Sequence, residues 1–252
     1  MLQDLKTRPI IGFPVAVTHY AEAAQWCIDR ADMGDRAYAV GAANTHVLSQ
    51  ARHDDDFGRV MGRFDLICPD GMPLIWSLNA QLPADQKLKD RVYGPSLMLA
   101  VMKATTQKSE HSHFLLGGQQ STLDKLSLRF SENEIAGVYS PPFGEWADDE
   151  NEKIRNLIRE SGAKYVWVGL GCPKQETWIA KHLDSLPSAV YFGIGAAFAF
   201  HAGEVKQAPA FIQKSGMEWL FRLCAEPRRL FKRYAVHNSL FLYYTLKDHV
   251  SG

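Results

Sequence analysis

The 252-residue sequence lacks a surplus of charge of either sign, because 28 lysine and arginine residues balance 28 aspartate and glutamate residues. A protein without net charge has no overall electrostatic attraction to nucleic acid, so we expect no nucleic-acid partner and only local binding of anions. Cysteine is also scarce, and its four residues lie far apart without a Cys-x-x-Cys pair. This spacing argues against a disulfide scaffold or a zinc knuckle and is typical of a reducing compartment.

Long apolar runs are missing as well. No stretch approaches the roughly 18 consecutive apolar residues that a membrane-spanning helix requires. Residues 1–9 contain no apolar segment after their positive charges, so they do not resemble a signal peptide. We therefore expect a cytoplasmic protein without a transmembrane segment.

What the sequence does contain is an alternation of short apolar runs and helical patterns. The runs that resemble buried strands are 37–41, 66–68, 114–116, 135–139, 165–168 and 189–194. Their alternation with helical segments predicts an α/β fold with a mostly parallel sheet and helices on both faces. We also expect an edge strand within 10–17, one helix from 44 to about 60, and a mobile polar loop over 80–92.

The C-terminal part of the sequence has a different character. Strand patterns end near residue 213, which predicts an α/β core over 1–212 and a helical appendage over 213–252. The appendage carries a basic cluster that consists of Arg222, Arg228, Arg229, Lys232 and Arg233. Arginine pairs bidentately with phosphate oxygens, so the cluster can neutralise a diphosphate, although a solvated helix face has the same pattern. The apolar run 239–244 beside it suits either a helix on a membrane surface or a last helix packed on the core.

The stretch 165–176 combines a buried strand with a glycine turn and a polar helix start. Gly169 and Gly171 follow the strand, and Lys174, Gln175 and Glu176 occupy the first helical turn. Glycine allows the backbone to turn sharply and to approach a ligand closely. In open α/β sheets, phosphorylated ligands bind at such a strand end, beside the N-terminus of a helix. Many strand-to-helix junctions contain glycine and proline, but three long polar side chains favour a binding site.

Other strands end in similar turns. Asp70 follows a strand within Pro-Asp-Gly, where an aspartate more often stabilises a turn but can also act as a general base. Gly117–Gly118 and Gly195 follow two further strands. None of these turns has the Gly-x-Gly-x-x-Gly pattern of a dinucleotide site, so each is weak alone. We expect them to gather at one rim of the sheet.

Two groups of potential metal ligands carry little weight. Asp54, Asp55 and Asp56 form an Asp-x-Asp within the expected helix 44–60, where a solvated helix face explains them better. His111 and His113 alternate before a strand, but no third ligand stands at suitable spacing. We therefore expect no metal site and no cofactor.

Several motifs together resemble one family, the WecG/TagA/CpsF glycosyltransferases (glycosyltransferase family 26). The motifs include Asn44-Thr-His-Val-Leu, Pro69-Asp-Gly-Met-Pro, Arg91-Val-Tyr-Gly-Pro, Val168-Gly-Leu-Gly-Cys-Pro-Lys-Gln-Glu, Gly193-Ile-Gly-Ala-Ala-Phe and Glu226-Pro-Arg-Arg-Leu-Phe-Lys-Arg-Tyr. The resemblance implies a Rossmann-like core with a C-terminal appendage. It also implies metal-independent, inverting transfer from a UDP-sugar to an undecaprenyl-diphosphate-linked saccharide, at the inner face of the cell membrane, in exopolysaccharide or cell-envelope glycan synthesis.

The resemblance also suggests roles for individual residues. Asp70 would be the base on the acceptor hydroxyl. The UDP-sugar would contact Asn44, Thr45, Arg91, Gly117, Gly118, Gly169, Gly171, Lys174, Gln175, Glu176 and Gly195. The tail arginines Arg222, Arg228, Arg229 and Arg233 would neutralise the leaving UDP, as a metal does in other enzymes. The tail would also contact the membrane, and a homo-oligomer is possible.

The sequence departs from the family pattern at Ala42, Ser96, Ala199 and Gln207, where other members often carry different polar residues. These positions affect the expected sugar most, because a lost hydroxyl or carboxylate changes which sugar hydroxyls are bonded. The sugar can be of the N-acetylmannosamine, uronic acid or hexose type. Two alternatives stay open: a catalytically silent membrane adaptor that binds a nucleotide-sugar, and an oxidoreductase that uses a nucleotide cofactor.

Overall fold

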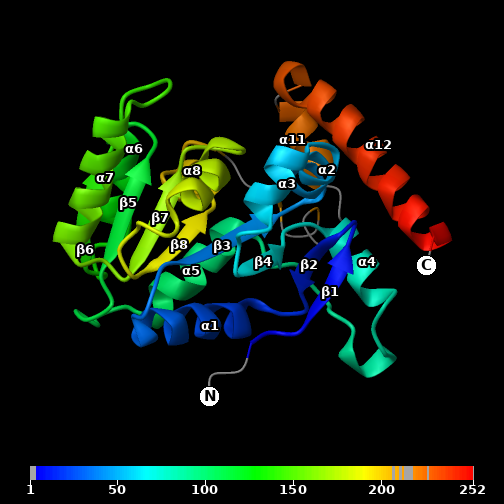
Figure 1. Cartoon of the computed structure of the whole chain (residues 1–252), viewed down its shortest axis with the longest axis horizontal. Coiled ribbons are helices and arrows are strands. Elements are labelled where there is room, and N and C mark those ends of the chain that lie inside the picture. The colour runs from blue at the N-terminus through cyan, green and yellow to red at the C-terminus, as the bar shows by residue number, and fades with distance from the viewer. Residues whose placement is uncertain (1–3, 206–207, 210–211, 213–217, 226, 252) are drawn as a thin grey trace.

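A computed structural model shows an α/β fold around one six-stranded sheet, with a short helix and a long helix in its C-terminal part (Figure 1). The structure describes residues 4–205, 208–209, 212, 218–225 and 227–251, without the side chains of Glu218, Arg222, Ala225, Arg229, Arg233 and Ser251. All strand pairs in the sheet are parallel, in the order β4-β3-β8-β7-β5-β6. The sheet confirms the Rossmann-like fold class.

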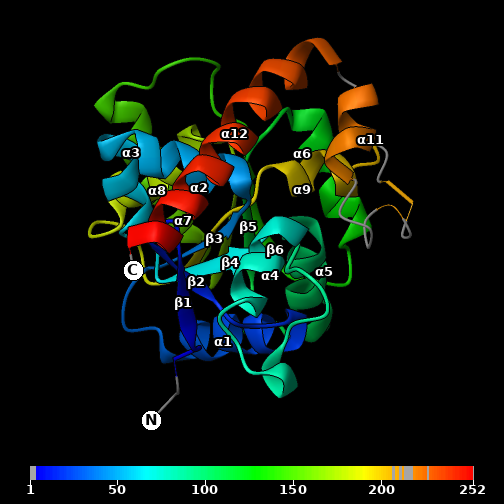
Figure 2. The same cartoon turned by 90° about the vertical axis from the view of Figure 1, so that its right-hand side faces the viewer.

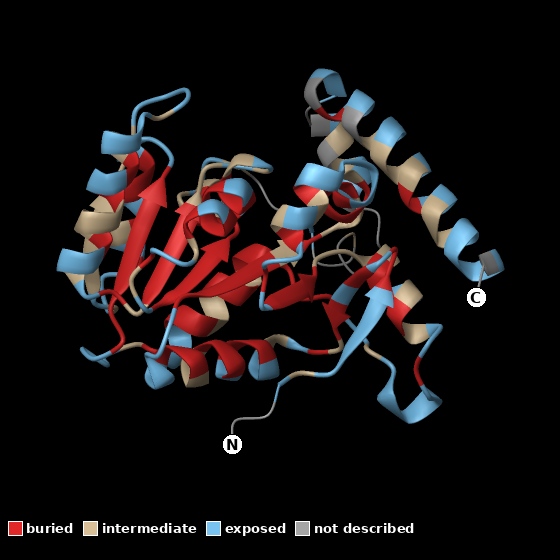
Figure 3. Ribbon diagram, viewed as in Figure 1, coloured by how far each residue is buried: buried red, intermediate tan, exposed pale blue. Residues whose placement is uncertain are grey.

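The six strands match the six apolar runs of the sequence. They are β3 (Tyr38–Ala43), β4 (Leu66–Pro69), β5 (His113–Gly117), β6 (Ile135–Tyr139), β7 (Tyr165–Gly169) and β8 (Val190–Gly193). Strands β7 and β8 read Tyr-Val-Trp-Val-Gly and Val-Tyr-Phe-Gly, and nearly all of their residues are buried. Continuous apolar strands of this kind are expected where helices cover both faces of a parallel sheet. Figure 3 shows the central strands as the buried layer of the molecule.

Helices cover the two faces of the sheet in separate groups. One group comprises α2 (Thr45–His53), α3 (Asp55–Met61), α4 (Met72–Asn79), α7 (Asp148–Ser161) and α8 (Lys174–His182). The opposite group comprises α1 (Tyr20–Met33), α5 (Gly94–Ala104), α6 (Gln120–Arg129) and α9 (Ala196–His201). The chain therefore leaves β3 towards α2 on one face and leaves β8 towards α9 on the other. Ligands of open α/β sheets bind at such a switch point, outside the carboxyl ends of the strands.

The N-terminal apolar run does not join the sheet as an edge strand. It forms an antiparallel hairpin of β1 (Thr7–Ile10) and β2 (Phe13–Ala16). The turn uses Ile11 at φ 41° and Gly12 at φ 88°, a region of the backbone that isoleucine rarely adopts. Burial of Ile10, Ile11 and Val15 against the first group of helices compensates for this conformation.

The single helix expected from residue 44 to 60 is two helices. The break lies at Asp54, whose Oδ1 accepts hydrogen bonds from the backbone N–H groups of Asp56 (3.0 Å) and Phe57 (3.2 Å). Aspartate is a preferred N-cap because it satisfies backbone donors that have no partner within the helix. Asp54 is thus the cap of α3 rather than part of a continuous solvated helix face.

The C-terminal segment forms α11 (Glu218–Ala225) and α12 (Pro227–Ser251), and α12 lies along α2 (Figure 2). Side chains of the two helices join them: Thr45 donates to Asn238 Oδ1 at 2.9 Å, and Ser49 lies 3.2 Å from His237 Nδ1. Phe241 of α12 is buried. None of the helices in the described ranges is long and apolar enough to cross a membrane. The domain boundary expected at residue 213 falls at 213–217, outside the described residues.

Candidate functional site at the carboxyl rim of the sheet

Two cavities meet at the carboxyl rim of the sheet. The first, which we call the rim cavity, has a volume of about 310 Å³ and is lined by the turns after β7 and β8. The second, which we call the aromatic cavity, has a volume of about 380 Å³ and lies among α4, α11 and α12. Asn44, Asp70 and Tyr93 line both cavities. A ligand in either cavity can therefore reach the same small group of polar side chains.

Asp70 is placed by the end of β4. Its backbone N–H donates to the carbonyl of Ala43 on β3 at 2.8 Å, which fixes the first residue after the strand. Gly71 follows at φ 150° and starts α4. The carboxylate is 14% exposed, so it is largely shielded from water but can be reached through the two cavities. Asp70 thus has the accessibility and rigid support that a general base requires.

Arg91 brings a positive charge to Asp70. Its Nη1 lies 3.9 Å from Asp70 Oδ1, and its guanidinium stacks on the ring of Tyr93 at 4.4 Å. The N–H of Val92 donates to the carbonyl of Pro69 at 2.9 Å, which ties this segment to the end of β4. The loop that the sequence suggested as mobile therefore ends in a buried, hydrogen-bonded segment beside the candidate base. It also contains the short helix η1 (Ala84–Gln86).

Asn44 caps α2 and faces both cavities. Its Oδ1 accepts from the backbone N–H groups of His46 (3.1 Å) and Val47 (3.2 Å). Because these donors require the oxygen on that side, the Nδ2 amide group is what Asn44 offers to a ligand. Its neighbour Thr45 also lines the aromatic cavity, and its hydroxyl bonds to Asn238 on α12.

Gln175 connects the turns after β7 and β8. Its Oε1 accepts from the N–H groups of Gly171 (3.1 Å) and Gly195 (3.0 Å), and its Nε2 donates to Glu176 Oε1 at 2.8 Å. Gln175 is 5% exposed and Glu176 3%. All four residues line the rim cavity. Gln175 therefore sets the shape of this cavity, in addition to any contact with a ligand.

Other residues that the sequence suggested lie apart from the two cavities. Lys174 points towards the loop before α7, where its Nζ donates to the carbonyl of Gly144 and lies 4.0 Å from the centre of the Trp146 ring. Partial burial lowers the pKa of Lys174. Gly118 and Gly169 lie against Phe198 of α9: a Cβ would come within 3.6 Å of that ring from Gly118 and within 2.5 Å from Gly169, so Gly169 allows α9 to pack closely on the strand ends. A Cβ on Gly117 would instead meet the carbonyl oxygen of Gly169 at 2.7 Å.

Of the four tail arginines, the structure describes the side chain of Arg228. Arg228 is exposed on α12. The side chains of Arg222, Arg229 and Arg233 lie outside the described residues, so the neutralisation of a diphosphate by this cluster stays a prediction. Ala42 and Ala199, two of the departures from the family pattern, line the rim cavity, and Ser96 lines a neighbouring cavity. Gln207 lies outside the described residues.

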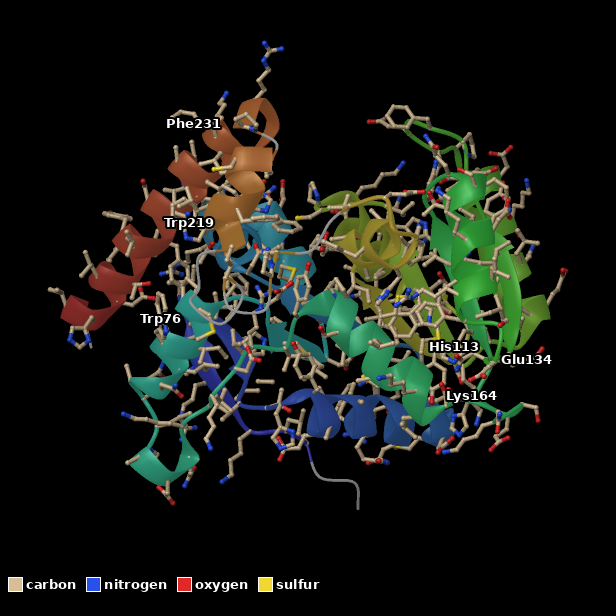
Figure 4. All side chains as sticks on the ribbon, turned by 180° about the vertical axis from the view of Figure 1, so that it is seen from behind. Trp76, His113, Glu134, Lys164, Trp219 and Phe231 are labelled. Atoms are coloured by element: carbon tan, nitrogen blue, oxygen red, sulfur yellow. The ribbon has the colours of Figure 1, made fainter. Side chains whose placement is uncertain are left out.

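Sequence reasoning missed the aromatic walls of the second cavity. They comprise Trp76 on α4, Tyr93, Trp219 on α11, and Tyr234 and Phe241 on α12. The only signal was the aromatic content of the tail and the tyrosine in Arg91-Val-Tyr-Gly-Pro, because nothing in the sequence indicated that α12 would face α4. Figure 4 shows Trp76 and Trp219 on the same side of the molecule, away from His113.

The two histidines that we considered as metal ligands take part in buried packing. His113 lies at the start of β5, the end of the strand remote from the cavities. Its Nδ1 accepts from Trp167 Nε1 at 3.1 Å, its Nε2 lies 3.0 Å from the Thr105 hydroxyl, and burial lowers its pKa to about 3. His111 Nδ1 lies 2.8 Å from the Tyr165 hydroxyl. Within the described ranges, no group of three or more His, Cys, Asp or Glu side chains is placed to hold a metal ion.

The fold and the rim together define a class: a doubly wound α/β protein that presents a shielded carboxylate between two ligand cavities at its switch point. The comparison with family models makes this class specific. Residues 8–252, essentially the whole chain, match the model of the glycosyl transferase WecG/TagA/CpsF family, and the chain belongs to this family. The protein is therefore a glycosyltransferase, in a family that serves cell-envelope glycan synthesis, with a nucleotide-sugar as donor and a glycan as acceptor.

Proposed function

We propose that the protein transfers a hexosyl or N-acetylhexosaminyl group from a UDP-sugar to a polyprenyl-diphosphate-linked saccharide, with inversion and without a metal ion. The observation that carries this proposal is the position of Asp70 between the rim cavity and the aromatic cavity. Inversion requires the acceptor hydroxyl and the leaving group on opposite sides of the anomeric carbon. A base between two cavities can serve an acceptor in one and a sugar donor in the other.

In this reaction Asp70 accepts the proton of the acceptor hydroxyl as that oxygen attacks the anomeric carbon. The bond from the anomeric carbon to the UDP oxygen breaks, and UDP leaves with the electron pair. Arg91, 3.9 Å from Asp70, orients the carboxylate, and the amide of Asn44 donates to a sugar hydroxyl. The rim cavity would hold the UDP-sugar, with its shape set by Gln175 and by Ala42 and Ala199 at the sugar end.

The leaving diphosphate needs cationic neutralisation, which a divalent metal supplies in many sugar transferases. We assign this role to the arginines of the tail, Arg222, Arg228, Arg229 and Arg233. A guanidinium forms two parallel hydrogen bonds with phosphate oxygens and needs no bound metal to do so. The sugar itself is of the N-acetylmannosamine, uronic acid or hexose type.

The C-terminal helix would contact the cytoplasmic face of the cell membrane, where a polyprenyl-linked acceptor resides. Tyr243, Leu246 and Val250 are spaced along one face of α12 and are 57%, 66% and 85% exposed. An exposed apolar face on a basic helix is the composition of a helix that lies in a membrane interface.

The test is the Asp70→Asn variant, which keeps the shape of the side chain and removes the base. We expect UDP binding to stay within about twofold, while transfer falls by at least about 100-fold, the range in which proton transfer contributes. The control is Asp56→Asn, because Asp56 is an exposed carboxylate that pairs with Arg59. If Asp70→Asn turned over as fast as wild type, Asp70 would not be the catalytic base.

A second measurement tests the metal-independent part of the proposal. Transfer should persist in excess EDTA, and strict dependence on Mg²⁺ or Mn²⁺ would contradict it. Tighter binding of NAD than of UDP would favour an oxidoreductase instead, and the absence of both transfer and UDP-sugar hydrolysis would favour a silent adaptor.

A further inference from the structure

The aromatic cavity has a different chemistry from the rim cavity. The rim cavity is lined by glycine turns, by Gln175 and by Glu176, whereas aromatic and aliphatic side chains dominate the walls of the aromatic cavity. Binding sites that are mostly apolar use a few placed polar groups to orient their ligand. The aromatic cavity therefore suits a ligand with apolar faces and a small number of hydroxyl groups.

Two asparagines in the lining of the aromatic cavity have a fixed amide orientation. Asn44 Oδ1 is occupied by the cap of α2, and Asn238 Oδ1 accepts the hydroxyl of Thr45 at 2.9 Å. Each asparagine therefore presents its Nδ2 amide group as the donor for a ligand. Asp70 adds an acceptor in the same cavity. Two amide donors and a carboxylate acceptor form the hydrogen-bonding set that sugar hydroxyls require.

The cavity also opens along an apolar path to the surface. Trp76, Trp219 and Leu242 line it and are nevertheless 56%, 40% and 63% exposed. The same side chains thus form both the wall and the mouth of the cavity. Figure 4 shows two of them, Trp76 on α4 and Trp219 on α11, on the same side of the molecule. A nucleotide has no aliphatic chain to place against such a mouth, whereas a lipid-linked ligand does, so the apolar mouth favours a ligand with a lipid end.

We propose that the aromatic cavity is the acceptor subsite, in which the terminal sugar of a prenyl-diphosphate-linked saccharide stacks on Trp76 while Asn238 and Asn44 hold its hydroxyl groups. The lipid end leaves between Trp219 and Leu242. This assignment rests on the proposed function, since it requires Asp70 to act on the acceptor. It makes α12 a wall of the active site and Trp76 and Asn238 residues that determine the acceptor.

The experiment uses the full-length protein and two soluble probes. The first is farnesyl-diphosphate-linked N-acetylglucosamine, which carries a sugar on a short lipid, and the second is UDP. Titration calorimetry gives the affinity for each probe, and transfer kinetics with a UDP-sugar give separate KM values for acceptor and donor. Farnesyl diphosphate without a sugar serves as the reference ligand.

Trp76→Ala should lower the affinity for the sugar-bearing probe by about tenfold, the loss expected when one aromatic contact disappears. The affinity for UDP should stay within about twofold of wild type. Trp76→Phe should recover most of the loss, because a ring remains. Since Trp76 is 56% exposed, its replacement leaves the core intact. The matched control is Phe231→Ala, an aromatic residue that is 67% exposed on α12 and outside the lining of the cavity.

Asn238→Asp tests the hydrogen-bonding part separately. The variant keeps an oxygen for the Thr45 hydroxyl, loses the amide donor and adds a negative charge to the cavity, so we expect at least about fivefold weaker acceptor binding with α12 still docked. A proportional loss of UDP affinity in either variant would overturn the assignment. So would equal binding of farnesyl diphosphate with and without the sugar.

These outcomes are distinct from a failure of the proposed function. If UDP did not bind, or if Asp70→Asn retained transfer, the proposed function would be wrong. If UDP bound and Asp70→Asn lost transfer, but Trp76→Ala left the acceptor KM unchanged, only the acceptor subsite would be wrong.

Discussion

Gly195 should be intolerant of even the smallest side chain. A Cβ at this position would lie 2.5 Å from Gln175 Oε1 and 3.0 Å from the backbone nitrogen of Gly171. The backbone of Gly195 is at φ −50°, which alanine adopts easily, so the conflict is one of space rather than of backbone conformation. Since Gly195 lies in a turn that is fixed by β8 and α9, the Gln175 side chain has to move.

The cost follows from the hydrogen bonds of Gln175. Its amide makes three of them, with the N–H groups of Gly171 and Gly195 and with the carboxyl group of Glu176. A net hydrogen bond contributes about 1 kcal/mol, so displacement of the side chain should lower the free energy of unfolding by about 2–3 kcal/mol. UDP affinity should fall as well, because the two turns line the rim cavity.

A double-mutant cycle isolates this cause. Gln175→Ala removes the same hydrogen bonds, and Gly195→Ala then has no Oε1 to displace. We expect the double variant to be only slightly less stable than Gln175→Ala alone, because the 3.0 Å contact with the backbone nitrogen of Gly171 remains, with a coupling energy of about 2 kcal/mol. Urea unfolding followed by tryptophan fluorescence measures each corner of the cycle.

The control is Gly94→Ala, which places a Cβ in the same cavity. This Cβ would meet Ala42 and Ile194 at 3.4 Å, an ordinary contact, so stability should change by less than about 0.5 kcal/mol. Additive losses in the cycle, or a Gly195→Ala variant as stable as Gly94→Ala, would refute the role assigned to Gln175.

Three further predictions concern other parts of the molecule. Burial lowers the pKa of His113 from 6.5 to about 3, so the neutral side chain contributes fully to stability above pH 6.5. Below pH 6.5 the unfolded state takes up a proton that the folded state does not, so about 2 kcal/mol of stability is lost at pH 5. In His113→Gln, the free energy of unfolding measured with urea should depend less steeply on pH over this range, by about one proton. Thr45→Val removes the hydrogen bond to Asn238 and should speed amide hydrogen exchange in α12 about fivefold, with exchange in β7 unchanged. Leu246→Gln should lower the affinity for phosphatidylglycerol vesicles, measured by co-sedimentation, about tenfold. Leu128→Gln, at a 78% exposed position on α6, should leave this affinity unchanged.

The sheet could be predicted because its strands are continuous apolar runs. The residues of β7 from Tyr165 to Val168 are all buried, and a segment of this length and composition fits few other positions in a soluble protein. The hairpin turn at Ile11 could not be predicted, because its positive φ is maintained by tertiary burial rather than by local preference. The helix break at Asp54 carried a local signal, since aspartate is a preferred cap.

The motifs indicated several of the residues that line the two cavities but not the directions of their side chains. Lys174 and Gln175 are neighbours on the first turn of α8, and sequence alone does not determine which one faces the cavity. The structure turns Gln175 inward to the glycine turns and Lys174 outward to Trp146. Asn44 and Thr45 show the same division, because one caps α2 and the other bonds to α12. The aromatic cavity depends on contacts between α4 and α12, which are far apart in the sequence.

The register of the sheet explains why Asp70 is more than a turn residue. Strands β3 and β4 pair in parallel with Ala43 opposite Pro69, so Asn44 and Asp70 are the next residues on two neighbouring strands. Parallel pairing requires both strands to end at the same rim, and the N–H of Asp70 still donates to Ala43. A shift of one residue in this register would turn one of the two side chains to the other face of the sheet. Asn44 and Asp70 therefore line the same cavities because of strand pairing, which a turn preference at Asp-Gly alone would not produce.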